Sequence, residues 1–177
     1  TLPIFRALFG GDWRNPARGG SIDLTRANRS PGSALKPFVY ARAFAEGLAA
    51  PDALMSDAPE RFGNYAPENF DRGFAGTVTA AEALRRSLNL PAVQLLHLIG
   101  PARFAAELRQ SGAGLRLPPG ADPALPIALG GAGISLLRLT GLYAALATDG
   151  DGGGLTLLAD RPAPRAPFLD PRSAAET

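Results

Sequence analysis

Cysteine is absent from these 177 residues, and the only histidine is His97. Without cysteine the chain cannot form disulfides, thiolate metal sites or a cysteine nucleophile. One histidine also excludes a metal site built from several. His97 lies in the apolar stretch 95–99, which favours a satisfied, partly buried helix residue over a member of a Ser-His-Asp triad. We therefore expect neither a metal nor a cofactor.

Charge and long apolar runs are also scarce. Charged residues make up 19% of the chain, the net charge is +2, and Arg85-Arg86 is the only adjacent basic pair. Nucleic-acid binding would predict a basic stripe with interleaved aromatics, so we expect no nucleic-acid partner. No apolar run reaches the roughly 20 residues that cross a bilayer. Membrane association would thus need a segment that this chain does not contain.

Lysine is the third scarcity, because Lys36 is the only lysine among 18 basic residues. A lysine can lose its proton and act as a base, whereas an arginine is effectively never neutral. Ser33 precedes Lys36 by three residues, a spacing at which a helix brings amine and hydroxyl together. Chance remains an alternative. Two of the 18 basic positions, Lys36 and Arg138, follow a serine by three residues, so a randomly placed lysine does so about one time in nine.

The positions of proline, glycine and helix-capping residues predict several helices. Hydrophobic content of 46% suits a globular domain with a buried core. Pro31-Gly32 precedes a helix over 33–45, and a long turn-rich loop follows over 50–78. Thr79 and Glu82 form a capping box, and this helix breaks around 87–89. Further helices are expected from Pro91 to Gly100, from Pro101 to Gly112, and from Ser135 to Gly150.

Strand signals are weaker than the helix signals. Alternation over 21–25 predicts a half-buried strand, 8–12 resembles a strand end with a turn, and 154–158 is a further strand. The predicted fold class is α+β, mainly a helical lobe with a fragment of antiparallel sheet. We divide the chain into a domain over 1–160 and a proline-rich, weakly structured tail over 161–177.

Four residues supply the parts of a serine acyl-transfer site. A serine hydroxyl such as that of Ser33 needs a base, and Lys36 can be that base if burial lowers its pKa by about 3 units. Ser87 can relay a proton, and the amide of Asn89 offers both a donor and an acceptor to a peptide bond. Ser33 at a helix N-terminus also benefits from the helix dipole. Each residue has a plainer alternative as a helix cap or a corner residue.

The flanks of these residues resemble penicillin-binding proteins and serine β-lactamases. Ser-x-x-Lys at 33–36 follows Pro-Gly, and Ser-x-Asn at 87–89 falls on a corner between helices, as in that family. Segments 65–70, 82–93 and 129–133 also look like class A transpeptidase modules, with the bifunctional 1C type the most similar. The resemblance covers about residues 20–155.

The resemblance implies a D,D-transpeptidase that acts on peptidoglycan stem peptides. Ser33 would attack the penultimate D-alanine carbonyl, Lys36 would take its proton, Ser87 would relay a proton to the departing D-alanine, and Asn89 would hold the peptide. β-Lactams would acylate the same serine. The location implied is periplasmic or extracytoplasmic, with an inner-membrane anchor in the full-length protein.

One family motif is missing. The Lys-Thr/Ser-Gly strand cannot occur here, because Lys36 is the only lysine and Leu139-Thr140-Gly141 falls in a predicted helix. We therefore expect an N-terminal part of the domain that is inactive alone and exposes apolar faces where the sheet would pack. The alternatives are a non-catalytic penicillin-binding-like sensor or scaffold domain, and an unrelated helical domain with accidental matches.

Overall fold

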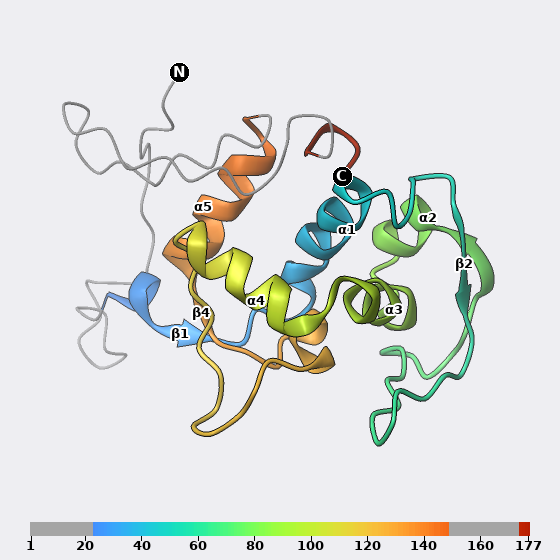
Figure 1. The fold of residues 1–177 in the computed structure, drawn as a ribbon, viewed down its shortest axis with the longest axis horizontal. Coiled ribbons are helices and arrows are strands. Elements are labelled where there is room, and N and C mark those ends of the chain that lie inside the picture. Colours follow the sequence, from blue (N-terminus) through green and yellow to red (C-terminus); the bar gives the residue numbers. More distant parts are fainter. Residues whose placement is uncertain (1–22, 149–173) are drawn as a thin grey trace.

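The computed structural model describes residues 23–148 and 174–177, which contain five α-helices and share one core (Figure 1). The element order is η2 (Leu24–Arg26), β1 (Asn28–Arg29), η3 (Gly32–Leu35), α1 (Lys36–Ala45), β2 (Leu54–Asp57), β3 (Gly76–Thr79), α2 (Ala80–Arg85), α3 (Asn89–Ile99), α4 (Pro101–Gln110), η4 (Leu125–Leu129), β4 (Ile134–Ser135) and α5 (Leu136–Leu146).

Helix α1 forms the centre of the core. Figure 1 shows it in the middle of the molecule, with α5 on one side and α2 and α3 on the other. Seven of its ten residues are buried, including Phe38 and Tyr40, which have no exposed surface. A helix that is apolar nearly all round must be covered on every side. Helix α3 supplies much of that cover, through buried residues such as Leu96.

Two small antiparallel sheets complete the α+β fold that the sequence predicted. Strands β1 and β4 pair with Asn28 opposite Ser135, and β2 and β3 pair with Leu54 opposite Thr79. The second pair corrects the interpretation of 50–78 as a loop without strands. Each of its strands has only four residues, and they are joined across a long connection, so pairing rather than local sequence determines them.

The expected strand over 21–25 is also corrected within the described residues. Residues 24–26 form the 3₁₀ helix η2, because the side chain of Asp23 accepts a hydrogen bond from the backbone N–H of Thr25. This local bond competes with an extended backbone. The predicted strands at 8–12 and 154–158, and most of the 161–177 tail, lie outside the described residues.

The helix caps follow the sequence closely. Thr79 and Ser135 accept hydrogen bonds from the backbone N–H groups of Glu82 and Arg138, as the capping signals predicted. Helix α3 begins at Asn89, two residues before the expected start at Pro91. Helix α5 ends at Leu146, and its predicted stop at Gly150 lies outside the described residues. Among the described residues, no helix is long and apolar enough to cross a membrane.

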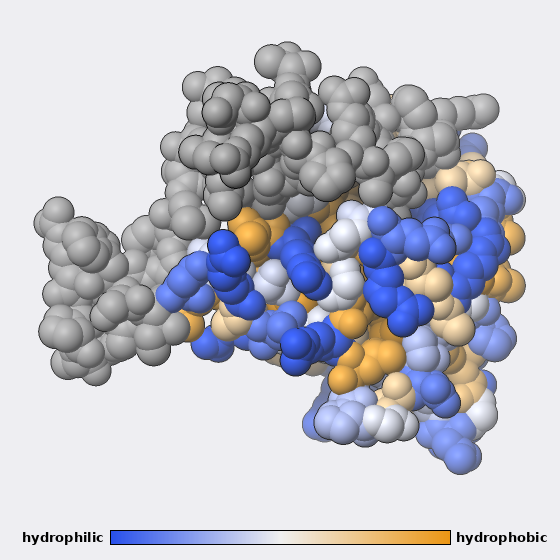
Figure 2. All heavy atoms as spheres, turned by 60° about the vertical axis from the view of Figure 1, so that its left-hand side comes forward, coloured by the Kyte–Doolittle hydropathy of each residue, from blue (hydrophilic) through white to orange (hydrophobic). Residues whose placement is uncertain are grey.

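Some apolar side chains reach the surface, and Figure 2 shows apolar patches between charged residues on one face. Leu54 and Leu98 are 74% and 61% exposed, and both line a groove of about 380 Å³ between β2 and α3. His97 also lines this groove, with its ring 5.3 Å from that of Phe62. It is helical as predicted, but it is exposed rather than partly buried.

Candidate active site

Lys36 is the most unusual polar residue of the core, with only 1% of its surface exposed. It begins helix α1, directly after the 3₁₀ turn that contains Ser33. Its Nζ atom lies 2.5 Å from the backbone oxygen of Ser87, 2.6 Å from Oδ1 of Asn89 and 3.2 Å from Oγ of Ser87. An ammonium has three donors, so these three oxygens satisfy it fully.

Burial also changes the acid–base behaviour of this amine. Removal from water disfavours the charged form and lowers the pKa of Lys36 from 10.5 to about 8. At pH 7 the neutral fraction rises from roughly one molecule in three thousand to about one in ten. The neutral amine keeps two N–H donors for the Ser87 carbonyl and Asn89, and its lone pair can then accept a proton. An amine with this pKa can accept a proton near neutral pH.

The partners of Lys36 lie on the corner between α2 and α3. Helix α2 ends at Arg85, and Ser87 adopts a left-handed backbone with φ of 56°. This conformation turns the chain sharply, so that both oxygens of Ser87 point back to Nζ. Leu88 then buries its side chain, and Asn89 begins α3. Three of the four residues singled out in the sequence thus meet, although Lys36 and Ser87 are 51 positions apart.

Ser33 lies close to this group in the chain but is not bonded to it. The residue is exposed in η3, and its backbone oxygen accepts a hydrogen bond from the N–H of Lys36. Within the described residues, no hydrogen bond joins the Ser33 hydroxyl to the amine. An exposed hydroxyl beside a buried base is accessible to a ligand, and hydrogen bonds of this kind often tighten only when a ligand binds.

The backbone around Ser33 is held by contacts that sequence reasoning missed. The hydroxyl of Ser30 donates to the carbonyl of Gly130 over 2.7 Å and accepts from the N–H of Gly32 at 3.2 Å. The Tyr143 hydroxyl donates to the carbonyl of Ala34 at 3.0 Å. The contacts to Gly130 and Tyr143 connect the serine turn to the end of η4 and to α5, and the Gly32 contact holds the turn itself. The segment 129–133 was noted only for its family resemblance, and no local signal pointed to Ser30.

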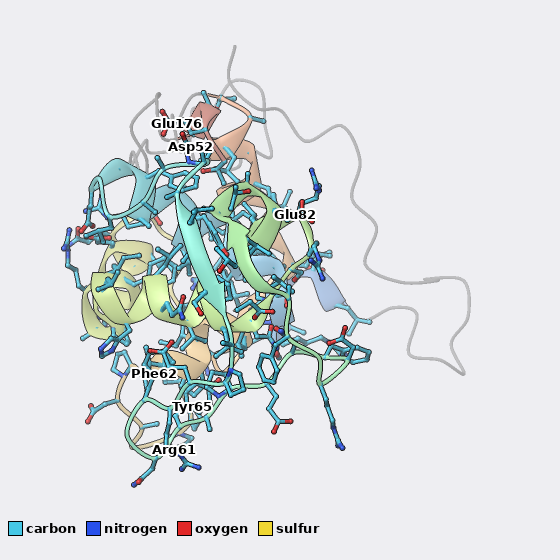
Figure 3. All side chains as sticks on the ribbon, turned by 90° about the vertical axis from the view of Figure 1, so that its right-hand side faces the viewer. Asp52, Arg61, Phe62, Tyr65, Glu82 and Glu176 are labelled. Atoms are coloured by element: carbon cyan, nitrogen blue, oxygen red, sulfur yellow. The ribbon has the colours of Figure 1, made fainter. Side chains whose placement is uncertain are left out.

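A second missed set lies behind Asn89. Asn69 and Asp57 are 7% and 0% exposed and are hydrogen-bonded to each other, and Asn69 also accepts a hydrogen bond from the N–H of Asn89 at the corner. Both reside on the segment that runs from β2 to β3. In Figure 3 this segment carries Phe62 and Tyr65 far from Asp52 and Glu82, which flank the two strands. The motif at 65–70 was noted in the sequence, but burial of Asn69 is a property of the tertiary structure.

The groups gathered around Lys36 are a hydroxyl, a backbone carbonyl and a side-chain amide. In the described ranges, no three side chains of histidine, cysteine, aspartate or glutamate gather in a group that could hold a metal ion. The arrangement instead joins a buried amine of lowered pKa, a hydroxyl in contact with it, a side-chain amide and an accessible serine. Such a set can activate a hydroxyl and pass its proton on.

Comparison with known proteins identifies the family of this chain. Residues 14–158 match the penicillin binding protein transpeptidase domain family. The chain is 48% identical over 163 residues to penicillin-binding protein 1C of Escherichia coli, covering 92% of this chain and 21% of that protein. It is 37% identical over 127 residues to penicillin-binding protein 1F of Bacillus subtilis, covering 70% and 17%. The chain therefore belongs to the penicillin-binding protein transpeptidase family, and it spans about a fifth of the length of these curated relatives.

Solved structures share the fold. The penicillin-binding protein PonA1 of Mycobacterium tuberculosis superimposes with a TM-score of 0.71 at 22% identity, over 86% of this chain and 47% of that one. The transpeptidase domain of penicillin-binding protein 3 from Burkholderia pseudomallei gives 0.73 at 19% identity, over 88% and 54%. PonA1 has also been solved in complex with penicillin V. The observed helices and small antiparallel sheets thus form part of a penicillin-binding transpeptidase fold.

Proposed function

We propose that this chain carries the nucleophile, the base and the proton relay of a peptidoglycan D,D-transpeptidase. One observation supports the proposal above all others: the buried Lys36 amine contacts both Ser87 and Asn89 while its pKa is lowered to about 8. Burial lowers the pKa of a lysine whatever its role, so the contacts of the amine with Ser87 and Asn89 are what favour catalysis. Given the family of the chain, we infer that the substrate is a stem peptide ending in D-Ala-D-Ala.

The reaction begins at Ser33. Neutral Lys36 removes the hydroxyl proton as Oγ attacks the carbonyl of the penultimate D-alanine, forming a tetrahedral oxyanion. The Ser87 hydroxyl, 3.2 Å from the Lys36 amine, passes a proton to the nitrogen of the leaving D-alanine. The C–N bond then breaks and leaves an ester on Ser33. An amine of a neighbouring stem peptide, or water, releases that acyl group by the reverse proton path.

Asn89 orients the substrate in this proposal. Its Oδ1 accepts a hydrogen bond from Lys36, and its Nδ2 donates to the backbone oxygen of Glu68. The amide orientation is thereby determined, and a bound peptide would exchange one of these contacts for its own. The backbone N–H of Ser33 supplies one donor for the oxyanion. The 177 residues contain no Lys-Thr-Gly motif for a second donor, and loss of one such donor typically lowers turnover a hundredfold or more.

Partners and location follow from the same family membership and belong to this proposal. We expect peptidoglycan stem peptides and β-lactams to bind at Ser33, on the extracytoplasmic side of the inner membrane. We assign residues 1–160 to the transpeptidase domain and 161–177 to a tail outside it.

Labelling with a fluorescent penicillin tests the assignment in the full-length gene product. The expected result is one labelled protein, with mass spectrometry placing the adduct on the peptide that contains Ser33. Ser33→Ala should abolish the label, and Lys36→Met should slow acylation about 100- to 10,000-fold. Ser56→Ala is the matched control, because Ser56 is an exposed serine on β2. A folded protein that takes no label on Ser33 would contradict the proposal.

Release of D-alanine from a stem pentapeptide separates the enzyme from its alternative. A transpeptidase releases D-alanine and forms cross-linked product, whereas a sensor or scaffold domain takes the penicillin label without turnover. Labelling without any D-alanine release would therefore favour the non-catalytic domain.

A further inference from the structure

Asn69 is the buried residue that joins the loop between β2 and β3 to the catalytic corner. Its Oδ1 accepts a hydrogen bond from the backbone N–H of Asn89 at 2.7 Å. That N–H belongs to the first residue of α3, where no residue of the helix itself can accept it. Asn69 therefore caps α3 from a segment 20 positions away. This long-range cap explains why α3 begins at Asn89 rather than at Pro91.

The orientation of Asn69 is determined by its other end. Its Nδ2 lies 2.9 Å from each carboxylate oxygen of Asp57 and 2.9 Å from the backbone oxygen of Gly73. Three acceptors around one NH₂ group leave no place for a carbonyl oxygen. The amide cannot flip, so Oδ1 must face Asn89.

Asp57 is the anchor of this arrangement. It has no exposed surface, and it also accepts a hydrogen bond from the N–H of Ala75 at 2.7 Å. A buried carboxylate needs such donors, because its desolvation is otherwise costly. Removing a donor would leave the carboxylate under-satisfied, so Asp57 and Asn69 hold each other in place.

The side chain of Asn89 depends on the same anchor. Its Nδ2 donates to the backbone oxygen of Glu68 over 2.6 Å, and Glu68 immediately precedes Asn69 in the chain. Two consecutive residues thus hold Asn89. The backbone oxygen of Glu68 binds the side chain of Asn89, and the side chain of Asn69 binds its backbone N–H. With Nδ2 bound to Glu68, Oδ1 of Asn89 is directed at Nζ of Lys36, 2.6 Å away. A continuous path of hydrogen bonds therefore runs from Asp57 to the amine.

We infer that Asp57 and Asn69 are positioning residues, which hold Asn89 and through it keep Lys36 buried in the geometry of a base. The inference rests on the proposed function for the role of Lys36, but neither residue touches substrate. If the anchor is lost, the corner loosens and water reaches the amine, which restores the charged form. The neutral fraction at pH 7 would then fall from about one molecule in ten to about one in a hundred or fewer.

The single lysine of the chain makes this measurable without any enzyme assay. Labelling with lysine enriched in ¹³C at the ε carbon gives one NMR signal, and its titration reports Lys36 alone. The unmodified 177-residue chain should titrate at about 8. Asn69→Leu keeps a similar volume and removes both ends of the link, and it should move the titration midpoint up by about one unit or more. In the full-length gene product, acylation of Ser33 at pH 7 should then slow about tenfold, in proportion to the neutral fraction.

Two further variants complete the comparison. Asp57→Asn keeps the size and shape of the side chain but replaces one carboxylate oxygen with an NH₂ group, which cannot accept the hydrogen bond from Asn69. This variant should also raise the titration midpoint of Lys36. Asn64→Leu is the matched control, because Asn64 is an exposed asparagine of the same loop, and its midpoint should equal that of the unmodified chain. A folded Asn69→Leu variant with an unchanged midpoint would overturn the inference.

The unmodified chain provides a test that does not depend on variants folding. The side-chain NH₂ protons of Asn69 should exchange with solvent at least about tenfold more slowly than those of Asn64, because Asn69 and its acceptor Asp57 are buried. Equal exchange rates would overturn the inference. The penicillin label on Ser33 is a separate measurement. A shifted midpoint in a protein that takes no label supports the positioning role and removes only the proposed function.

Discussion

The backbone carbonyl oxygen of Ser87 lies 2.5 Å from Nζ of Lys36, and the left-handed backbone of Ser87, with φ of 56°, accompanies this contact. An L-residue other than glycine pays about 1–2 kcal/mol for such a backbone. Strain of this kind persists where surrounding contacts over-determine it, which is common at functional sites. Here the contact to a buried amine and the turn between two helices hold the residue.

Replacement of Ser87 should separate backbone strain from the hydroxyl. Ser87→Ala and Ser87→Gly both remove Oγ, but only glycine adopts positive φ without strain. After the extra entropy of the unfolded glycine chain is counted, we expect Ser87→Gly to be more stable than Ser87→Ala by about 0.5–1 kcal/mol in urea unfolding. Arg72, with φ of 58° in an exposed loop, is the matched control. Arg72→Ala and Arg72→Gly compare the same two residues at a left-handed position away from the buried amine. A more stable alanine variant at 87 would contradict this account.

The lowered pKa of Lys36 should appear in the pH dependence of stability. Between pH 8 and pH 10 the folded chain has lost the proton of Lys36, whereas the unfolded chain, with a pKa of 10.5, still binds it. The unfolded state then holds more protons, so the free energy of unfolding rises with pH, by about 2–3 kcal/mol over this window. Below pH 8 both states are protonated, and the full cost of burying the charge remains.

Lys36→Met is the reference for this measurement. The methionine variant cannot titrate, so the difference in unfolding free energy between it and the unmodified chain should change between pH 8 and pH 10. Above pH 10 the trend reverses for the whole chain, because burial raises the pKa values of Tyr65 and Tyr143 and the unfolded tyrosines ionise first. A difference that does not depend on pH would show that Lys36 keeps its ordinary pKa.

Gly130 should tolerate no side chain, because the serine turn packs directly against it. A Cβ atom there would lie 2.5 Å from Oγ of Ser30 and 2.6 Å from both Cα and N of Gly32. We expect Gly130→Ala to destabilise the chain by about 2 kcal/mol more than Gly120→Ala. Gly120 also has positive φ, at 74°, but nothing lies within 4 Å of its Cβ position, so it isolates the backbone strain. Equal losses in thermal or urea unfolding would contradict the steric argument.

Removal of the Tyr40 hydroxyl should leave the stability of the protein unchanged or raise it. The side chain has no exposed surface, and in the described part of the chain its hydroxyl has no hydrogen-bond partner. Burial, together with the negative charge of Asp57, raises the pKa of Tyr40. Removing an unsatisfied buried hydroxyl is neutral or favourable, so Tyr40→Phe should leave stability unchanged or raise it by about 1–2 kcal/mol.

Tyr143 provides the matched comparison. Its hydroxyl donates to the backbone oxygen of Ala34 at 3.0 Å, so Tyr143→Phe should cost about 1 kcal/mol. The two tyrosine-to-phenylalanine changes therefore have opposite expected signs in the same unfolding assay. A loss of stability in Tyr40→Phe as large as that in Tyr143→Phe would mean that the Tyr40 hydroxyl is bonded in solution.

The helices could be predicted because their signals are local. The caps at Thr79 and Ser135 bind N–H groups three residues away, and proline and glycine mark the boundaries of α4. The strands β2 and β3 could not be predicted in this way. They have four residues each, and their pairing closes a loop of 18 residues that Asp57 and Asn69 hold from inside. Such pairing depends on contacts that no local pattern contains.

The residues of the candidate site also differ in whether the local sequence could identify them. Ser33 and Lys36 are three residues apart, so a helical turn and the chemistry of their side chains were enough to single them out. Ser87 and Asn89 were singled out by their side-chain chemistry and by resemblance to a family motif, but physical reasoning on the sequence alone could not bring them to Lys36, more than 50 positions away. Asp57 and Asn69 received no role at all, since an aspartate or asparagine in a polar loop is ordinarily solvated.

The sequence by itself determined the chemical inventory of this protein: no thiol, one imidazole and one amine able to lose a proton, with a hydroxyl one turn before it. Only the tertiary structure decided that this amine is buried to 1% exposure, because helices α1 and α3 must cover each other's apolar faces and the corner before α3 covers Nζ. Composition can supply a base, but its pKa depends on how much water and how many oxygens surround it, and those belong to the packed chain.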